Sequence, residues 1–412
     1  MSMARTFSGR QTRRRHGAVW SAVAVTAALG LTSCQNTPSQ AAEPATPGAT
    51  ASASPSPTTP AAQVTVSPEP GSRKVRPDQP VTVSAGGGRL TAVTLTDAKG
   101  RKVEGAFTAD RGRWSSIEPL TPRTTYSVQA VATNAAQQET RTTAELRTLT
   151  PAVTADYHLV PSGATEVGIG MPVVVQFDGL VDESRRAAVE RRLSVTTSPA
   201  VKGAWGWLDA RQLVWRPQSY WKPGTRVKVK ADIGGLQTRK GVWTTHDAST
   251  RFKVGSAMVS TVDVQKHTLT VRRNGKVLRV IPVTTGKEKF PTRNGVKVIL
   301  SRETSRQMDA ETTGLKKTDP EYYNVKVKYA MRLTWSGEFL HAAPWSVGSQ
   351  GRANVSHGCT GMSTANAHWL FERSKMGDVV RYVGSKRPLE SYNGYTMWNM
   401  NLASWAKQSA LA

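Results

Sequence analysis

Residues 63 to about 255 consist of short alternating apolar and polar stretches, interrupted every few positions by Gly, Pro or Asn. Residues 80–84 (Pro-Val-Thr-Val-Ser) and 171–177 (Met-Pro-Val-Val-Val-Gln-Phe) are examples. A period of two places successive side chains on opposite faces of a strand, so that one face is buried and the other meets water. The pattern therefore predicts an all-β fold for this region.

Two segments of this region repeat each other. Residues 122–130 and 223–231 carry Pro, Thr, an apolar residue, Val and Ala at the same alternate positions. The repeat predicts two similar domains, residues 63–150 and 151–255, each the size of an immunoglobulin-like β-sandwich. Tryptophans in both domains are expected in the sandwich cores, and sugar binding is the alternative. They are Trp114, Trp205, Trp207, Trp215 and Trp221.

The first 34 residues carry five arginines and no acidic residue, and residues 18–32 form an uncharged, mostly small and apolar run. This pattern predicts a secretion signal, and the run is short for a membrane span. The ending Leu31-Thr32-Ser33-Cys34 resembles the lipobox of bacterial lipoproteins. That resemblance implies cleavage before Cys34, a lipid on its thiol and attachment to the outer face of the cytoplasmic membrane. An ordinary signal cleaved nearby is the alternative.

Residues 35–62 are almost entirely Pro, Ala, Ser and Thr, with Glu43 as their only charge. Such a segment cannot bury a core, so it is expected to be a disordered tether that reaches into the cell wall. Without the signal, 50 basic and 29 acidic side chains remain, a net charge of about +21. This surplus favours polyanions. For an exported protein these are anionic wall polymers, acidic lipids and peptidoglycan carboxylates, and nucleic acid is an improbable partner.

A different pattern begins at residue 256. Strands are expected over residues 258–264, 268–273 and 276–284, and Asn274-Gly275 between the last two is a strong hairpin signal. Further along the chain we expect a strand-like stretch at residues 322–335, a helix at 364–373 and a strand at 378–383. The polar residues 301–320 are too long for an ordinary connection and are interpreted as an active-site lid.

The remaining residues, 384–412, hold Tyr392, Tyr395, Trp398 and Trp405. We expect this aromatic tail to pack on the preceding domain, with a possible helix over residues 403–412. The fold class is therefore mainly β: two immunoglobulin-like sandwiches followed by a mixed, predominantly β catalytic domain, residues 256–383, with a lid.

Cys359 is the single thiol left if Cys34 is lipidated. A lone thiol in an oxidising compartment suggests a reactive role. It lies in Ser356-His357-Gly358-Cys359, and His341 precedes this stretch by 15 residues. A histidine can take the thiol proton, and Gly358 lets the backbone approach a reacting carbonyl.

From these residues alone the stretch is a candidate Cys-His site. A buried structural thiol, a satisfied core histidine and a metal site of His341, His357 and Cys359 are the alternatives. No Cys-x-x-Cys or His-x-x-x-His spacing favours the metal site, so no metal and no cofactor are expected.

The spacing of His341 from Ser-His-Gly-Cys resembles the signature of YkuD-type L,D-transpeptidases. Residues 290–295 (Phe-Pro-Thr-Arg-Asn-Gly) are similar to the family's Thr-Pro-x-Gly region, and residues 377–380 (Gly-Asp-Val-Val) to its closing strand. The lipobox, the two sandwiches and the aromatic tail resemble the long actinobacterial members.

This resemblance implies an enzyme that joins peptidoglycan stem peptides. Cys359 attacks the third residue, a diaminopimelate, of a tetrapeptide donor and releases D-Ala. The thioester then passes to the side-chain amine of a neighbouring stem, giving a 3→3 cross-link. His341 is the implied base, oriented by the carbonyl of Ala342. Carbapenems are implied inhibitors.

The resemblance also implies roles for other residues. His357 would align the loop, and the N–H groups of Gly358 and Cys359 would hold the oxyanion. The remaining implied substrate-binding residues are Tyr323 on the inner wall, Ser336 and Gly337 in the donor pocket, and Met308 in the lid. One position departs from the family, which commonly has Asn where this chain has Gly361, so a substrate hydrogen bond could be missing.

Two other functions remain open. A wall-binding scaffolding lipoprotein would have lost catalysis, although the Cys-His pair argues against this. A cysteine peptidase would use water as the acceptor instead of an amine.

Overall fold

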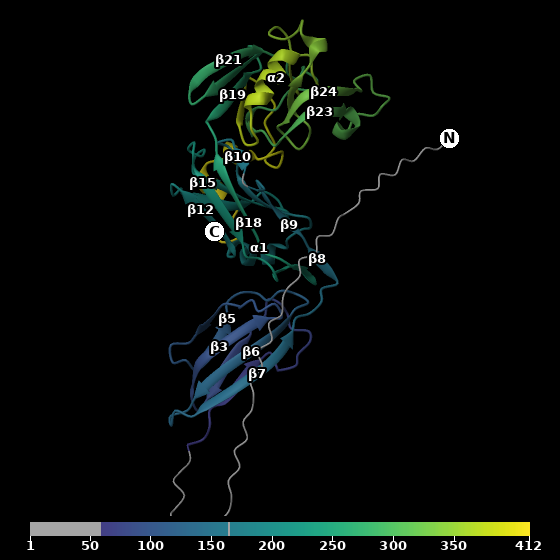
Figure 1. Ribbon diagram of the computed structural model, residues 1–412. Coiled ribbons are helices and arrows are strands. Elements are labelled where there is room, and N and C mark those ends of the chain that lie inside the picture. Colours follow the sequence, from purple (N-terminus) through teal and green to yellow (C-terminus); the bar gives the residue numbers. More distant parts are fainter. Residues whose placement is uncertain (1–58, 164) are drawn as a thin grey trace, which may run out of the picture. The chain divides into compact units, whose positions relative to one another are not determined.

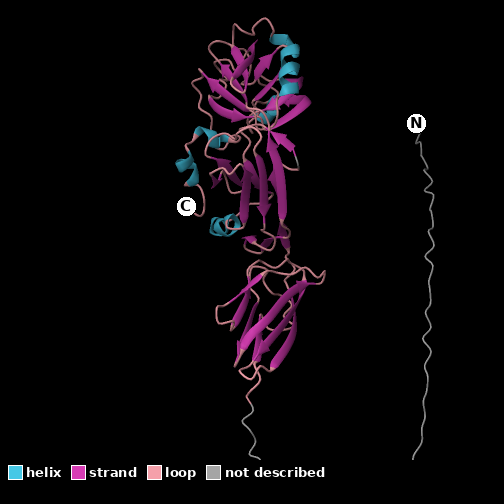
Figure 2. Cartoon of the chain, turned by 60° about the vertical axis from the view of Figure 1, so that its left-hand side comes forward, coloured by secondary structure: helices cyan, strands magenta, loops and turns pink. Residues whose placement is uncertain are grey.

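The structure is a computed structural model of the 412-residue chain that describes residues 59–163 and 165–412. The expected signal, Cys34 and residues 35–58 of the expected tether lie outside the described residues. Strands predominate over helices in the described chain, and the helices are few and short (Figure 2). Within this part, none of the helices has the length and apolar character needed to cross a membrane.

The first sandwich pairs a four-stranded and a three-stranded sheet around its own core. The four-stranded sheet has the order β1-β2-β5-β4 (Gln63–Ser67, Thr82–Gly86, Arg113–Ser116 and Gly105–Phe107). The other has the order β3-β6-β7 (Arg89–Asp97, Thr125–Thr133 and Glu139–Arg147). Tyr126 is buried and its hydroxyl accepts a hydrogen bond from the N–H of Thr121 at 2.8 Å. This contact closes one corner of the sandwich, as in immunoglobulin folds.

The second sandwich is built from two four-stranded sheets. One has the order β10-β18-β15-β12 (Thr165–Val167, Ala248–Val254, Arg226–Ala231 and Leu193–Ser198). The other has the order β13-β14-β11-β9 (Gly203–Trp207, Gln212–Pro217, Val173–Phe177 and Tyr157–Val160). A small sheet of β16, β17 and β8 (Gln237–Arg239, Val242–Thr244 and Val153–Ala155) adjoins them. The predicted pair of sandwiches is confirmed.

The repeated segments become equivalent strands. They form β6 and β15, and their alternate apolar residues are buried in both. Four of the five tryptophans, Trp114, Trp207, Trp215 and Trp221, are buried core residues, which confirms the core interpretation for them, while Trp205 is half-buried.

The expectation of an all-β region was wrong at one place, because α1 (Glu183–Glu190) lies within the second sandwich. Residues 182–190 contain no Gly or Pro, and only Val189 and Glu190 of the helix are buried. A segment this short and polar has little apolar periodicity, so only its local helix propensity indicates the helix. Glu190 nevertheless accepts a hydrogen bond from the indole N–H of Trp207 at 2.6 Å.

The catalytic domain has a five-stranded and a four-stranded sheet. The first has the order β21-β20-β19-β27-β22 (Lys276–Pro282, Thr268–Arg273, Met258–Asp263, Val379–Val383 and Gly295–Val298). The second has the order β23-β24-β25-β26 (Ser301–Asp309, Asn324–Arg332, Phe339–Ala342 and Thr360–Met362). Helix α2 (Thr364–Arg373) packs on β24 and β25 (Figure 1). Asn274 and Gly275 have φ angles of 50° and 83°, as a type I′ hairpin turn requires.

The predicted lid has a different form from the one expected. Residues 301–309 are not loop but strand β23, which pairs along its length with β24. Only residues 310–323, including the 3₁₀ turn η1 (Ala310–Thr313), connect the two strands. Met308 is the one fully buried side chain of β23, so the strand lacks the apolar alternation that identifies most strands.

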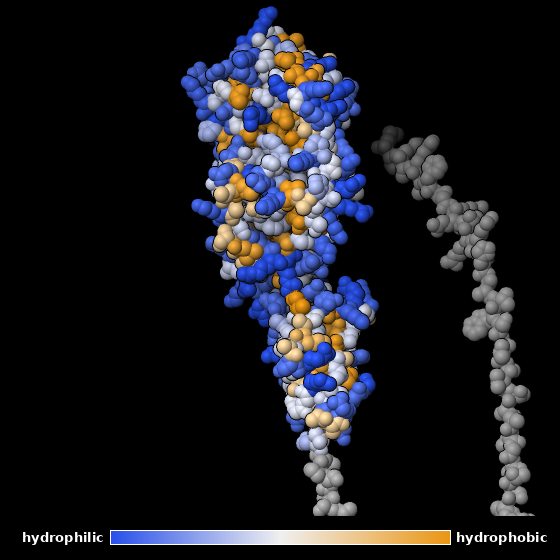
Figure 3. All heavy atoms as spheres, turned by 90° about the vertical axis from the view of Figure 1, so that its left-hand side faces the viewer, coloured by the Kyte–Doolittle hydropathy of each residue, from blue (hydrophilic) through white to orange (hydrophobic). Residues whose placement is uncertain are grey.

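The tail also departs from the expectation, because it packs on two domains. Asn393 bonds Ser336 of the catalytic domain at 2.8 Å, but the indole N–H of Trp405 donates to the Ala204 carbonyl of the second sandwich at 3.2 Å. Trp405 is fully buried in a core shared with that sandwich. This part includes η3 (Thr396–Asn399) and α3 (Leu402–Ala406), and the C-terminus lies beside the second sandwich (Figure 1). On the side of the molecule that Figure 3 shows, hydrophilic side chains predominate and hydrophobic ones lie in small groups.

Candidate active site

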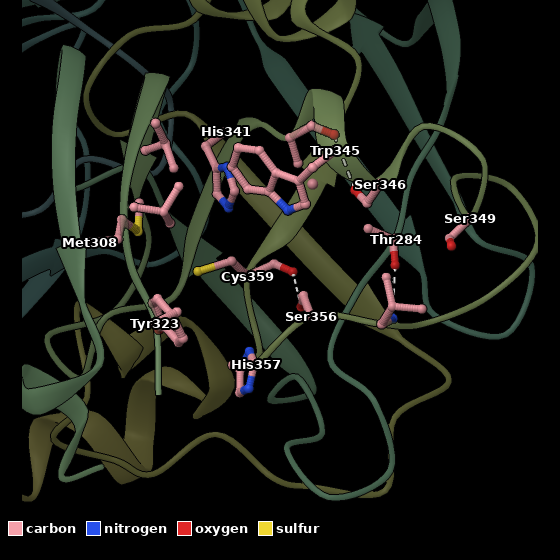
Figure 4. A pocket seen from close by; sticks show the side chains of 15 residues that line it. Thr284, Met308, Tyr323, His341, Trp345, Ser346, Ser349, Ser356, His357 and Cys359 are labelled. Atoms are coloured by element: carbon pink, nitrogen blue, oxygen red, sulfur yellow. Dashed lines mark hydrogen bonds between the residues drawn. The ribbon is translucent and has the colours of Figure 1, made fainter. Parts of the chain in front are cut away.

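Two neighbouring strands bring the predicted nucleophile and base together. β25 pairs with β26 in parallel, with His341 opposite Gly361 and Leu340 opposite Thr360. Cys359 lies two residues before Gly361 and therefore on the same face of the sheet. Figure 4 shows the Cys359 sulfur and the His341 ring projecting into one cavity. Residues 18 positions apart in the sequence thus share one site.

The cavity has a volume of about 570 Å³ and is largely apolar. Tyr323, Met308, His357 and Gly361, all predicted site residues, line it with Cys359 and His341. Trp345, in the 3₁₀ turn η2 (Pro344–Ser346), also lines it and is 59% exposed. An exposed indole at the edge of a cavity offers an apolar surface to a bound ligand.

One ring nitrogen of His341 is hydrogen-bonded to the backbone. Nδ1 lies 2.8 Å from the Ala342 carbonyl oxygen, the contact that the family resemblance implied. A carbonyl only accepts, so Nδ1 carries the proton and Nε2 retains a free lone pair. Burial lowers the pKa of His341. The ring is therefore neutral at pH 7 and suited to accept a proton.

Cys359 is a protonated thiol in this environment. Burial raises its pKa to about 12, and the Glu338 carboxylate acts in the same direction, while Lys297 and Arg332 oppose it. The Sγ atom lies 3.5 Å from the carbonyl oxygen of Gly337. A thiol and a neutral imidazole in one cavity fit a mechanism in which the base removes the proton as the sulfur attacks.

The loop before Cys359 is held by short polar contacts. The Ser356 hydroxyl donates to the Cys359 carbonyl at 2.7 Å, and Thr292, from the predicted 290–295 motif, donates to the Gly358 carbonyl at 2.7 Å. Gly358 has a φ of +125°, which non-glycine residues rarely adopt. The Gly358 N–H donates to Ser356 Oγ at 3.1 Å, so this predicted oxyanion donor already has a partner.

His357 links this loop to the β23–β24 connection. Its Nε2 lies 2.9 Å from Glu321 Oε2, and its ring packs between Phe290 and Tyr323 at centroid distances of 4.8 and 4.9 Å. Glu321 also accepts from Lys287 at 2.5 Å. These contacts agree with the alignment role implied for His357.

A second, smaller cavity of about 100 Å³ adjoins the first. It contains Ser336 and Gly337, the two residues implied for the donor pocket, and it shares Met308 and Tyr323 with the main cavity. Burial raises the pKa of Tyr323 to about 12, so its hydroxyl remains a hydrogen-bond donor. Ser336 and Gly337 therefore lie beside the main cavity, with Gly337 contacting the thiol through its carbonyl.

Gly361 is enclosed by neighbouring side chains. A Cβ atom added there would lie 2.8 Å from the Cβ of Ala343 and 3.2 Å from Cγ2 of Thr284. The Gly361 N–H and carbonyl both bond to the backbone of Thr284, at 2.9 and 3.0 Å. This chain has little space for the Asn that the family commonly carries at this position.

A buried ionic network near the thiol was missed by the sequence analysis. Lys297 is fully buried and pairs with Glu338, whose other oxygen accepts from the N–H of Arg293 at 2.9 Å. The Lys297 ammonium also lies 3.7 Å from the centre of the Tyr382 ring. The sequence offered one indication of this network, a lysine between two valines in a strand. A lysine buried at such a position requires a partner of opposite charge.

Within residues 59–163 and 165–412, no three or more His, Cys, Asp or Glu side chains are placed to hold a metal ion. His341 and His357 each have other partners, Ala342 and Glu321.

Two family models match parts of this chain. A bacterial Ig domain model matches residues 72–237, and an L,D-transpeptidase catalytic domain model matches residues 257–381. The chain is 36% identical to L,D-transpeptidase 2 of Mycobacterium tuberculosis over 343 residues, 83% of this chain and 83% of that protein. It is 32% identical to L,D-transpeptidase 5 of the same species over 345 residues, covering 82% and 74% of the two chains.

A solved L,D-transpeptidase in complex with imipenem is 37% identical, with 57% of this chain and 100% of that chain covered, at a TM-score of 0.49. The family match to residues 257–381 contains both His341 and Cys359. Because the 36% identity to L,D-transpeptidase 2 extends over 83% of both chains, this chain belongs to the L,D-transpeptidase family.

Proposed function

We propose that this L,D-transpeptidase forms 3→3 cross-links between peptidoglycan stem peptides through a thioester on Cys359. The observation that carries the proposal is the presence, in one cavity, of the Cys359 thiol and of a His341 ring whose Nδ1 is already bonded to the Ala342 carbonyl. A neutral imidazole can accept the thiol proton only at Nε2 in this arrangement. The pair therefore supports general-base activation of the sulfur.

In the first half-reaction, Cys359 Sγ attacks the carbonyl carbon of the third residue of a tetrapeptide donor while His341 Nε2 takes the thiol proton. The amide bond to the terminal D-Ala breaks, and His341 returns the proton to the leaving amine. The N–H groups of Cys359 and Gly358 would stabilise the oxyanion, the second after leaving Ser356 Oγ.

In the second half-reaction, the side-chain amine of a neighbouring stem attacks the thioester. His341 accepts the amine proton and returns it to the departing sulfur, so the thiol is regenerated and an amide bond remains. The largely apolar cavity around Cys359 supports acyl transfer to an amine, because an apolar lining disfavours water at the thioester.

The test uses the full chain in a non-ionic detergent with a synthetic tetrapeptide donor and a diaminopimelate amine acceptor. We expect D-Ala release and a cross-linked product by mass spectrometry, abolished in Cys359→Ala and lowered about 10²- to 10⁴-fold in His341→Ala. His368→Ala is the matched control, because that side chain is 56% exposed on α2. A hydrolysed tripeptide alone would indicate a cysteine peptidase, and no turnover would favour a scaffolding protein.

The proposal extends to location. The Leu-Thr-Ser-Cys34 ending supports a lipid anchor on the outer face of the cytoplasmic membrane, and the Pro- and Ala-rich residues 35–62 support a tether into the wall. The net positive charge supports contact with anionic wall polymers.

A further inference from the structure

One face of the second sandwich carries a dense group of cations. Strands β15 and β18 are neighbours in the interior of the sheet β10-β18-β15-β12. Their outward-facing residues alternate with core residues and include five exposed cations, which we call the basic face: Arg226, Lys228, Lys230, Arg251 and Lys253. The opposite face of the same strands belongs to the hydrophobic core.

The strand register places like charges directly opposite each other. Arg226 pairs with Lys253, and Lys228 pairs with Arg251. Opposed side chains have Cβ atoms about 5 Å apart, and like charges in such positions destabilise a sheet. The cations of the two strands therefore repel each other in the unbound chain, and an anion bound over both strands would relieve this repulsion.

None of the three strands β12, β15 and β18 supplies a counterion. β12, β15 and β18, which the structure describes in full, contain no acidic residue. Glu166, opposite Lys253 on β10, is paired with Lys375 at 3.2 Å. Among the described residues, none of the five cations forms an ion pair.

A groove of about 460 Å³ lies over these residues. Four of the five cations line it, together with Thr196 and Ser198 of β12, which the strand register places opposite Lys228 and Arg226 on the same face. Thr165, Thr197, Val227 and Phe252 also line it, from the alternate strand positions whose side chains face the other way. Along a strand, alternate side chains are about 6.6 Å apart. The groove therefore presents a regular row of cations and hydroxyls to an extended ligand.

Protection of a sheet edge does not explain the pattern, because lysines serve that purpose on edge strands and β15 and β18 are interior strands. Nucleic-acid binding fits poorly, since the single aromatic residue of the three strands, Phe252, is buried and cannot stack on bases. Membrane insertion fits poorly as well, because none of the large exposed hydrophobic residues of the described chain lies on these strands.

We infer that the basic face is a binding site for an extended phosphodiester polymer of the cell wall. The two free oxygens of a phosphodiester diverge, so that one group can contact cations of both strands at once, while the hydroxyls donate to the remaining oxygen lone pairs. A carboxylate presents both oxygens along one edge. This inference rests on the proposed placement of the chain in the wall, and binding at this face would hold the catalytic domain near its substrate.

The test is binding of a soluble poly(glycerol phosphate) chain to the full chain in non-ionic detergent, with Cys359→Ala to prevent turnover. Four phosphate contacts predict a fall in affinity of about 50-fold between 50 and 200 mM salt, from a slope of about −0.7 per contact. Replacing all four groove cations with serine should weaken binding at least tenfold at 50 mM salt. This variant is Arg226→Ser, Lys228→Ser, Arg251→Ser and Lys253→Ser.

A control variant loses the same charge from exposed positions elsewhere, and its affinity should stay within about twofold of the parent. It is Lys99→Ser, Lys102→Ser, Lys276→Ser and Lys326→Ser. No binding, or equal weakening in both variants, would refute the basic face. Tighter binding to polygalacturonate than to poly(glycerol phosphate) would refute the phosphodiester assignment. Tighter binding to oligothymidylate or to anionic vesicles would refute the wall polymer as the ligand.

D-Ala release from a small soluble donor, measured with Cys359 present, should be unchanged in the groove variant. If the groove variant loses polymer binding but turns over normally, the basic face acts independently of catalysis. If the parent chain binds the polymer but shows no turnover, only the proposed enzymatic function is rejected.

Discussion

Replacing Gly361 with asparagine would restore the residue that the family commonly carries, yet the structure predicts harm. The new Cβ would lie 2.8 Å from the Cβ of Ala343, whereas carbon atoms pack best at about 3.5–4.0 Å. Ala343 is itself buried, and Gly361 is fixed by two backbone hydrogen bonds to Thr284. Neither Ala343 nor the backbone at residue 361 can move freely, so the overpacking should lower the free energy of unfolding by about 1–3 kcal/mol.

The assay is chemical denaturation followed by tryptophan fluorescence, together with D-Ala release from a tetrapeptide. Gly348→Asn is the matched control, because a Cβ at Gly348 meets no atom within 4 Å and neither glycine has a positive φ. Gly361→Asn should be less stable and less active than the parent, and Gly348→Asn should resemble it. Adding Ala343→Gly should recover at least 1 kcal/mol of the loss, since it removes the opposing carbon.

A Gly361→Asn variant as stable as the parent, or more active, would refute this reasoning. So would a loss that Ala343→Gly does not reduce, because the clash would then not be the cause.

Three further predictions concern other parts of the chain. Burial raises the pKa of Asp378 to about 7, whereas the unfolded chain releases this proton near pH 4, so the folded state loses stability as the pH rises from 4 to 7. Asp378→Asn should therefore raise the free energy of unfolding at pH 8 and not at pH 4, as measured by urea denaturation. A carbapenem should add one drug mass to Cys359, absent in Cys359→Ala and slowed in His341→Ala, and an adduct persisting without the thiol would contradict the mechanism. Cys34→Ala should release the protein from membranes with its turnover unchanged, and continued sedimentation with membranes would contradict the lipid anchor.

Much of the fold was predictable where local signals and tertiary packing agree. The hairpin at Asn274-Gly275 and helix α2 at residues 364–373 were predicted because turn chemistry and apolar spacing match their surroundings. Cys359 was predictable as a candidate site because a lone thiol near two histidines is visible in the sequence, whereas the choice of His341 over His357 depended on the family resemblance.

The missed features depend on contacts distant in sequence. Strand β23 reads as a polar loop because its partner β24, and not its own composition, keeps it extended. The Lys297–Glu338 pair joins residues 41 positions apart, and the sequence does not indicate which carboxylate meets a buried lysine. The second contact surface of the tail could not be inferred, because aromatic residues alone do not specify what they pack against.

The position of Trp405 has a consequence for the order of assembly. Its partner Ala204 is synthesised 201 residues earlier, so the strands of the second sandwich exist long before the side chain that completes their core. Until then, an apolar surface beside Gly206 remains uncovered in the growing chain. Contacts so distant in sequence form slowly, and nascent chains with open apolar surfaces are prone to aggregate. States in which Trp405 has not yet docked against the second sandwich therefore leave this apolar surface open, and they are the states in which the sandwich is prone to aggregate.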